Sequence, residues 1–174
     1  MNASAPRLRF EDVYRDHLAD VWRALAALGV READLADACQ EVFVVVHRQL
    51  AGFDGAAKVT TWLYAICLRV ASGFRRRAHT RREELVDAPP ERAAAEGPHH
   101  DLERARAMRQ LRAMLDALDD DKRSVFVLYE LEELPMREVA EAVGCPLQTA
   151  YSRLHAARRA LELAARAPGS EVAP

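Results

Sequence analysis

The sequence predicts an all-α protein of two small helical domains joined by a flexible linker, the C-terminal one containing a helix-turn-helix. Apolar residues recur at helical spacing along most of the chain, and a stretch rich in proline and polar residues interrupts them. We find no strand-like alternation of useful length and no internal repeat. The predicted parts are a disordered N-terminus at 1–9, helical domains at 10–77 and 101–166, a linker at 78–100 and a loose tail at 167–174.

The composition is typical of a soluble globular protein. Of the 174 residues, 50% are hydrophobic and 30% are charged, and the formal net charge is −2. A protein that coats nucleic acid without specificity is more basic than this. The charges are distributed unevenly, because residues 69–82 hold only basic charges whereas residues 116–141 are mainly acidic. This distribution indicates more than one class of partner.

No pattern in the sequence predicts an enzyme, a cofactor or a metal. Cys39, Cys67 and Cys145 lie far apart without metal or redox spacing, so we expect buried thiols in a reducing compartment. We find no nucleophile–base pair and no phosphate loop, and we expect no small-molecule substrate. The apolar runs are too short to span a bilayer and no signal peptide is recognisable, which predicts a cytoplasmic protein.

The first two helices are predicted by their apolar spacing, from Phe10 to about Gly29 and from about Arg31 to Leu50. The second helix has an acidic side with a phenylalanine close by. This group is Asp34, Asp37, Gln40, Glu41 and Phe43. It is either a solvated helix face or a docking face for a basic partner, with the phenylalanine as an apolar contact.

A third helix is predicted to start near Trp62 and to end in the arginine run at 75–77, with Thr60 and Thr61 suited to cap it. Trp62 and Tyr64 can stack on unpaired bases while nearby cations hold the nucleic-acid backbone. Trp62 can equally be a core residue. The candidate residues for this single-strand site are Lys58, Thr60, Thr61, Trp62, Tyr64, Arg69, Arg75, Arg76 and Arg77.

The second domain is predicted to open with a helix that reaches the acidic turn at 119–121, and this turn can cap the helix that follows. The apolar residues of the first of these helices are Leu102, Met108, Leu111, Leu115 and Leu118. The next helix continues into the segment 133–161.

Segment 133–161 has the pattern of a helix-turn-helix. Pro135 fits the first helical position, Gly144 supplies a tight turn and Pro146 forces a new helix to begin. The second helix is expected to turn Leu147, Ala150, Leu154, Ala157 and Leu161 inward. Its polar groups suit base edges and phosphates in a major groove, although a plain helical hairpin would show the same pattern. The candidate duplex-binding residues are Leu147, Gln148, Thr149, Tyr151, Ser152, Arg153, His155, Arg158 and Arg159.

Three segments, in this order, resemble the extracytoplasmic-function (ECF) sigma factors of the bacterial RNA polymerase sigma-70 family. DLADACQEVF at 34–43 is similar to the family's acidic helix, which docks on the clamp coiled coil of the polymerase. TWLYAI at 61–66, followed by the RRR run, is similar to the helix that melts and reads the −10 promoter element. Segment 119–161, which contains SRLHAARRAL, resembles the reader of the −35 element.

The resemblance implies a promoter-specificity subunit that directs transcription initiation. Its partners would be core RNA polymerase, promoter DNA and a cognate anti-sigma factor, which can be membrane-bound. The acidic group would then bind core polymerase, the single-strand candidates would bind the −10 element, and the duplex candidates would bind the −35 element. Arg69, Gly73, Ala150 and Tyr151 depart from common family residues, which affects the promoter sequence that is read.

The alternative is an ordinary helix-turn-helix regulator with an N-terminal sensing or dimerisation domain. Such a domain needs a ligand cavity or a dimer face. The acidic helix and the helix with Trp62, Tyr64 and the arginines both look like partner surfaces instead. This difference favours the sigma factor.

Overall fold

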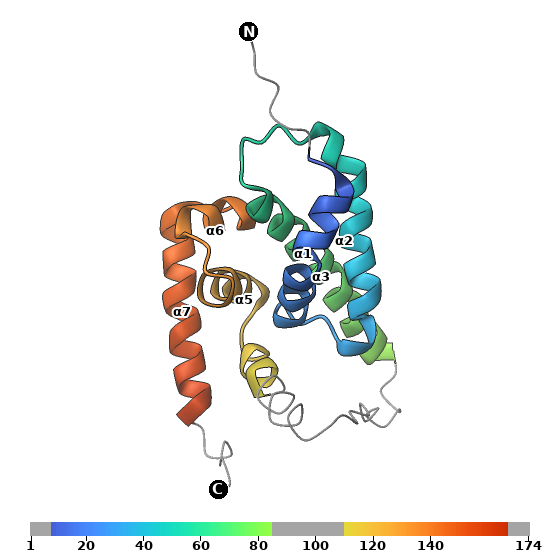
Figure 1. Cartoon of the computed structure of the whole chain (residues 1–174). Coiled ribbons are helices and arrows are strands. Elements are labelled where there is room, and N and C mark those ends of the chain that lie inside the picture. Colours follow the sequence, from blue (N-terminus) through green and yellow to red (C-terminus); the bar gives the residue numbers. More distant parts are fainter. Residues whose placement is uncertain (1–7, 85–109, 167–174) are drawn as a thin grey trace, which may run out of the picture.

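A computed structural model describes residues 8–84 and 110–166, and all the regular structure in these two ranges is helical (Figure 1). The predicted all-α class is therefore confirmed for the described residues. We call residues 8–84 the N-terminal half and residues 110–166 the C-terminal half. The predicted disordered N-terminus at 1–9, the linker and the loose tail lie largely outside the described residues.

The N-terminal half contains three helices that pack around an apolar core. Their order is α1 (Phe10–Ala27), the 3-10 turn η1 (Glu32–Asp34), α2 (Leu35–Gln49), the 3-10 turn η2 (Leu50–Gly52) and α3 (Val59–Glu84). Gly29 follows α1 with φ of +90°, a left-handed conformation that glycine adopts without steric cost. This residue lets the chain reverse between α1 and α2.

Helix α3 is longer than predicted at both ends. It begins at Val59, so Thr60 and Thr61 lie inside the first turn and do not cap the helix as expected. At the other end it passes the arginine run and continues to Glu84, seven residues into the expected linker. Residues 78–84 contain neither proline nor glycine, so no residue interrupts the helix there.

The C-terminal half begins with a helical stretch at residues 110–115, while Leu102 and Met108 lie outside the described residues. Then follow α5 (Asp120–Phe126), the π-helical segment η3 (Val127–Leu131), α6 (Met136–Val143) and α7 (Leu147–Arg166). The predicted cap at Asp119 is confirmed, because its side chain accepts a 2.9 Å hydrogen bond from the amide of Lys122.

Helices α6 and α7 form the predicted helix-turn-helix. Gly144 ends α6 in the left-handed region, with φ of 73° and ψ of 40°, as a tight turn requires. Pro135 was expected at the first helical position but lies one residue earlier, as the extended residue before α6. Val139 and Ala140 of α6, with Ala150 and Leu154 of α7, are buried between the two helices and α5.

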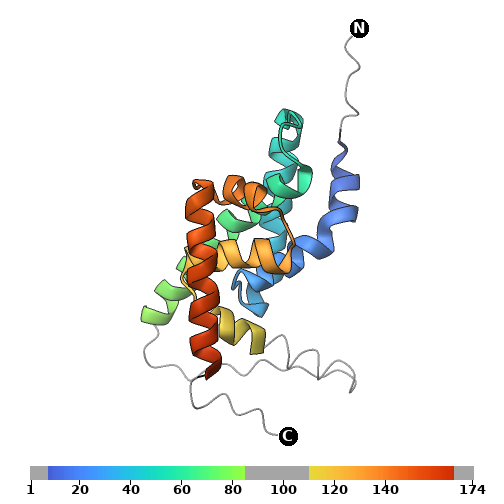
Figure 2. The ribbon, with the colours of Figure 1, turned by 90° about the vertical axis from the view of Figure 1, so that its left-hand side faces the viewer.

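The two halves pack against each other and share two apolar clusters. Helices α1 and α3 both contact the C-terminal half, α3 at α6 and α1 at η3, and they lie between α2 and the C-terminal helices (Figures 1 and 2). One apolar cluster joins Leu28 and Ile66 of the N-terminal half to Leu115 and Val127 of the C-terminal half. Among the described residues, no helix is both long and apolar enough to cross a bilayer.

Candidate DNA and polymerase interfaces

The acidic side of α2 is exposed. Asp37, Gln40 and Glu41 have helical spacing that puts them on one face of α2, and all three side chains are open to solvent. Asp34 lies in η1 at the N-terminal end of this face and is half-buried, because Arg31 donates to its carboxylate at 2.7 Å. These side chains form a continuous polar surface with three carboxylates.

Phe43 does not belong to this exposed surface. It is only 4% exposed, and its ring packs edge-on against Tyr14, with ring centroids 4.6 Å apart. The cause is helical spacing, since Phe43 continues the inward-facing positions of Cys39 and Val42 on α2. Phe43 was expected to add an apolar contact to the docking face, but the structure shows that it is a core residue.

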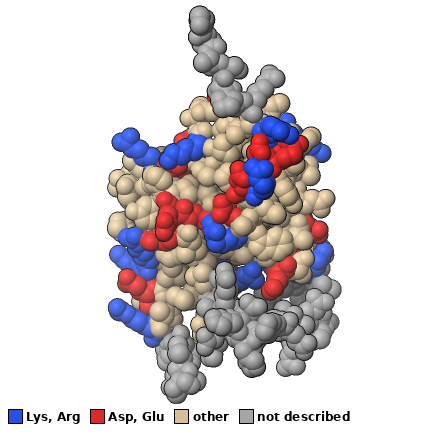
Figure 3. Space-filling view, viewed as in Figure 1, with Lys and Arg blue, Asp and Glu red and all other residues tan. Residues whose placement is uncertain are grey.

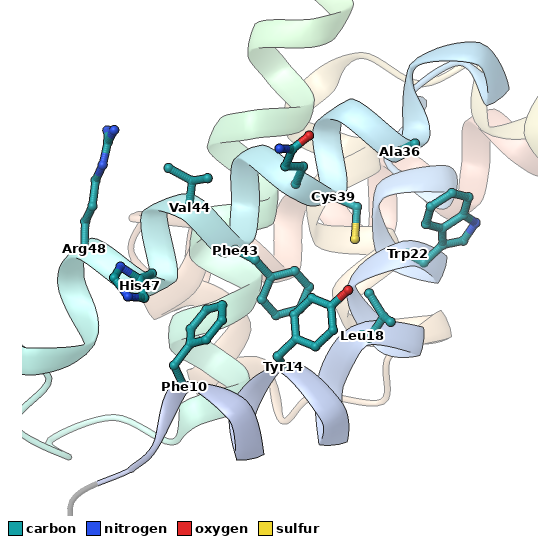
Figure 4. A pocket seen from close by; sticks show the side chains of 11 residues that line it. Phe10, Tyr14, Leu18, Trp22, Ala36, Cys39, Phe43, Val44, His47 and Arg48 are labelled. Carbon is teal, nitrogen blue, oxygen red and sulfur yellow. The ribbon is translucent and has the colours of Figure 1, made fainter.

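An apolar groove lies next to the acidic face, between α1 and α2 (Figure 4). It has a volume of about 650 Å³, and Phe43 lines it from α2. The exposed apolar side chains along it are Tyr14, Trp22 and Val44. Helical spacing groups Tyr14 and Trp22 with the apolar residues of α1, and this spacing does not distinguish a groove from a core.

Four of the predicted −10 residues contact carboxylates of the C-terminal half, and three of these, Lys58, Thr61 and Tyr64, lie at the start of α3. Lys58 forms an ion pair with Glu138 at 2.5 Å, and the Thr61 hydroxyl donates to the same carboxylate at 2.8 Å. The Tyr64 hydroxyl donates to Oε2 of Glu132 at 2.6 Å. Thr61 and Tyr64 are both buried by this arrangement.

Glu132 is the most enclosed of these carboxylates, with a side chain that is 0% exposed. Besides the Tyr64 hydroxyl it accepts two hydrogen bonds from Arg23 of α1, at 2.7 and 3.1 Å. Two effects raise the pKa of Tyr64 above its ordinary value: burial is the larger, and the hydrogen bond to Glu132 is the second. At the neighbouring site the hydrogen bond from Lys58, and then that from Thr61, lowers the pKa of Glu138.

The remaining −10 candidates lie in several environments. Trp62 is half-buried against Phe53, with ring centroids 4.9 Å apart, and packs at the edge of the core. Thr60 is half-buried, whereas Arg69 and Arg76 are exposed. We conclude that these four side chains form no single open surface.

The other two arginines of the run are engaged with neighbours. Arg75 donates to the carbonyl of Leu28 at 2.9 Å and forms an ion pair with Asp120 of the C-terminal half. Arg77 lies over the Phe74 ring at 4.2 Å and pairs with Glu41 at 3.4 Å. A basic side chain of the predicted −10 group therefore contacts a carboxylate of the predicted polymerase face.

Helix α7 presents a polar face to solvent. Most of the predicted −35 residues are exposed on it, namely Leu147, Gln148, Tyr151, Ser152, His155, Arg158 and Arg159, while Thr149 and Arg153 are half-buried. Leu147 was expected to point inward but is 39% exposed, because it occupies the first turn of α7 beyond the packed region. The exposed residues give α7 the surface that a recognition helix needs.

Carboxylates of the C-terminal half pair with two arginines of this helix. Arg153 binds Asp121, and Arg158 donates to Glu130 at 2.8 Å. On the face seen in Figure 3, basic and acidic side chains likewise lie next to one another and form no single patch of one sign. These pairs neutralise part of the positive charge that DNA would meet.

The cysteines occupy apolar positions. Cys39 and Cys67 are buried, and burial raises the pKa of both thiols, while Cys145 is half-buried. Within residues 8–84 and 110–166, no three His, Cys, Asp or Glu side chains gather where they could hold a metal ion. Sequence reasoning missed Glu132 and Glu138, which contact the −10 candidates from the C-terminal half, and Arg23, which binds Glu132; the charge pattern showed only that both glutamates belong to the mainly acidic stretch 116–141.

The fold and the exposed face of α7 define a helix-turn-helix protein of the kind that reads duplex DNA. Two family models identify it further: sigma-70 region 2 matches residues 13–81, and sigma-70 region 4 matches residues 108–161. The chain belongs to the sigma-70 family, and within it to the ECF RNA polymerase sigma factors.

The curated relatives are similar over most of the chain. The ECF RNA polymerase sigma factor SigE of Mycolicibacterium smegmatis is 29% identical over 87% of this chain, which spans 60% of that protein's length. The RNA polymerase sigma factor YlaC of Bacillus subtilis is 29% identical, with 87% of this chain and 89% of YlaC covered. The ECF RNA polymerase sigma-E factor of Escherichia coli is 28% identical, with 80% and 78% covered.

Two solved structures share the fold. CnrH in complex with the cytosolic domain of CnrY gives a TM-score of 0.70 at 22% identity, covering 92% of this chain and 89% of that one. The sigma factor RpoE in complex with the anti-sigma factor NepR from Bartonella quintana gives a TM-score of 0.69 at 19% identity, covering 91% and 98%. The likeness extends over both halves of the chain.

Proposed function

We propose that this chain is a sigma factor that binds core RNA polymerase and directs it to promoters, acting by binding and without catalysing a reaction of its own. The observation that carries the proposal is the order of surfaces along one chain. The exposed Asp37–Gln40–Glu41 face precedes the aromatic and basic helix α3, and the recognition helix α7 follows. Its place of action is the cytoplasm, where the polymerase works.

Each surface receives a role. Asp34, Asp37, Gln40 and Glu41 bind core polymerase through a basic surface of the enzyme. The proposed −10 face is Lys58, Thr60, Thr61, Trp62, Tyr64, Arg69, Arg75, Arg76 and Arg77, where aromatic rings and cations suit an unpaired strand. The exposed face of α7 reads the −35 element, with Gln148 and Ser152 suited to base edges and Arg159 to a phosphate.

An anti-sigma factor is a further proposed partner. The structure of RpoE that shares this fold was solved with the anti-sigma factor NepR. CnrH was likewise solved with the cytosolic domain of CnrY. We infer that the present chain is held inactive by a protein of this class.

The proposal is tested by gel filtration of the full chain with bacterial core RNA polymerase. We expect co-elution, and we expect Asp37→Ala with Glu41→Ala to weaken it about tenfold or more, because two exposed charges of the contact are lost. Asp16→Ala on α1 removes an exposed carboxylate outside the acidic face and serves as the control. Absence of co-elution, together with tight binding of the isolated chain to duplex DNA, would instead favour the ordinary regulator.

A further inference from the structure

A small cavity lies where the turn after α1 meets the start of the C-terminal half. Gly29 and Val30 line it from the turn, and Leu115 lines it from the C-terminal half. The cavity has a volume of about 200 Å³. Pockets for drug-sized ligands measure about 300 to 1,000 Å³. This cavity therefore suits a small ion, or one charged group of a larger molecule.

Positive charge dominates the lining of this cavity. Arg31, Arg112 and Arg123 line it, and the one carboxylate among the lining residues is Asp116. Arg123 already donates a 2.9 Å hydrogen bond to Asp116. A single carboxylate cannot neutralise three guanidinium groups, so the cavity is electrostatically suited to an anion.

The acidic partners of the other two arginines do not line the cavity. Arg31 pairs with Asp34 at 2.7 Å, whereas Arg112 lies 3.8 Å from Glu32. An N–O distance of 3.8 Å is longer than a hydrogen bond, and Glu32 is 74% exposed, so this pair compensates the charge of Arg112 weakly. Arg112 is therefore the lining arginine with the weakest acidic partner.

Two guanidinium groups at this place have unused donors. The Nε atoms of Arg75 and Arg112 are buried and have no hydrogen-bond partner among the described residues. Arg75 reaches the rim of the cavity from α3, because a Cβ added to Gly29 would lie 3.1 Å from its Cδ and 3.2 Å from Cζ of Arg123. A buried donor without a partner costs free energy, and a ligand oxygen that accepts from it recovers that cost.

Arg123 carries a charge that its surroundings compensate incompletely. It is 5% exposed, and burial lowers the pKa of Arg123, as does the charge of nearby Arg75. A bound anion counters both effects. The planar fork of arginine donates paired hydrogen bonds to the oxygens of phosphates and carboxylates. Phosphate offers acceptor oxygens in several directions, as donors that converge from different segments require.

We propose that this cavity binds a phosphate group, either as the free ion or as part of a nucleotide, held by Arg112 and Arg123. Both arginines belong to the C-terminal half, whereas Gly29 and Val30 belong to the N-terminal half, so the bound group contacts both halves. Neither arginine belongs to the proposed polymerase, −10 or −35 surfaces. The inference therefore goes beyond the proposed function and does not depend on it.

Isothermal titration calorimetry of the full chain, at constant ionic strength, tests the proposal. The probes are inorganic phosphate, ATP without magnesium, and acetate. We expect one site per chain, with acetate bound at least about tenfold more weakly than phosphate because it offers fewer oxygens and less charge. Tighter binding of ATP than of phosphate identifies a nucleotide as the ligand, and equal binding identifies the free ion. Binding of neither phosphate nor ATP, or equal binding of acetate and phosphate, would overturn the proposal.

Arg112→Gln should weaken phosphate binding about tenfold, because a charge-assisted donor is lost. The fold should tolerate this change, since the Arg112 side chain is 28% exposed. Arg48→Gln is the matched control: it removes the same charge from an exposed position of α2 that does not line the cavity, and it should bind phosphate as wild type does. Equal losses in the two variants would show a response to net charge alone and would refute the site.

Asp116→Asn predicts a change of the opposite sign, which a damaged fold would not produce. It removes the one carboxylate of the lining, and this side chain is 69% exposed. Phosphate should bind about threefold more tightly. Amide NMR spectra of wild type locate the site, because the signals of Gly29 and Val30 should shift with added phosphate while those of α7 stay unchanged. Unchanged affinity in Asp116→Asn, or shifts confined to α7, would contradict the assignment of this cavity.

Discussion

The hydroxyl of Tyr64 donates a 2.6 Å hydrogen bond to Oε2 of Glu132, 68 residues further along the chain. Tyr64 belongs to the proposed −10 helix α3, and Glu132 follows the π-helical segment that leads into the helix-turn-helix. Arg23 of α1 binds the same carboxylate. A single buried glutamate thus connects α1 and α3 to the DNA-reading half of the protein.

Replacing Tyr64 by phenylalanine should lower the free energy of unfolding by about 1 to 3 kcal/mol, because a buried charged acceptor loses a donor. Urea unfolding followed by circular dichroism measures this change. Tyr14→Phe is the control, since Tyr14 is 42% exposed and should change stability little. Equal effects of the two substitutions would show that the Tyr64–Glu132 bond contributes no stability.

The same tyrosine predicts a dependence on alkaline pH. The folded state raises the pKa of Tyr64, so it retains this proton where the unfolded chain begins to lose it, near pH of about 10. The stability that Tyr64 contributes is complete below that pH and falls as the pH rises further. Tyr64→Phe should therefore lose less stability than wild type between neutral pH and pH above about 10. Parallel curves for both proteins would contradict this expectation.

Gly29→Ala should destabilise the fold by about 2 kcal/mol, through its left-handed backbone and a steric clash. An added Cβ would lie 1.9 Å from Nη1 of Arg123. Arg123 cannot move away freely, because it is buried and donates to the carbonyl of Leu115 and to Asp116. Gly52→Ala is the control, since a Cβ there meets no nearby side chain of the described residues. Thermal unfolding of both variants measures the difference, and we expect the lower melting temperature for Gly29→Ala. Equal melting temperatures would contradict the prediction.

Asp119→Ala should cost about 0.5 to 2 kcal/mol, because α5 loses its N-terminal cap. Two hydrogen bonds lower the pKa of Asp119: the larger effect comes from the Lys122 side chain and the smaller from the Lys122 backbone amide. Its contribution is present above the ordinary aspartate pKa of about 3.9 and is lost as the pH falls further. Asp119→Asn keeps a capping oxygen without the charge, so it should retain much of the stability and show less of this acid sensitivity. Chemical unfolding at neutral and acid pH tests both statements.

Gln148→Ala and Arg159→Ala should affect promoter binding in different ways. Both side chains are exposed on α7. Loss of the amide should relax the preference for one −35 base pair, whereas loss of the guanidinium should weaken all sequences alike and reduce the salt slope by about 1. Gel-shift titrations of holoenzyme on a promoter and its −35 variants, at several salt concentrations, measure both effects. A uniform loss from Gln148→Ala would argue that it contacts phosphate.

Local signals in the sequence predicted much of the fold. Gly144 and Pro146 located the turn of the helix-turn-helix, and Asp119 was recognised as a cap, because these residues act through their own backbone geometry. The end of α3 was misplaced because the arginine run was taken as a stop, although arginine is a good helix former. Helix boundaries depend on turn and capping residues such as Gly144, Pro146 and Asp119 more than on charge.

Contacts between distant segments could not be predicted in the same way. Periodicity placed Tyr64 on the third helix and Thr61 at its start, but it carries no information about which glutamate, if any, faces them. Phe43 was grouped with the acidic face because it is close in sequence, whereas its spacing with Cys39 turns it into the core. Pairing across the two halves is a property of the tertiary structure.

Transcription in vitro with core RNA polymerase tests the central claim most directly. The template carries the DNA upstream of the gene for this protein, and the reaction is run with and without the purified chain. We predict a transcript with one start site that depends on the chain and disappears when Asp37 and Glu41 are both replaced by alanine. The same products with and without the chain, on a template to which the isolated chain binds tightly, would contradict its assignment as a sigma factor.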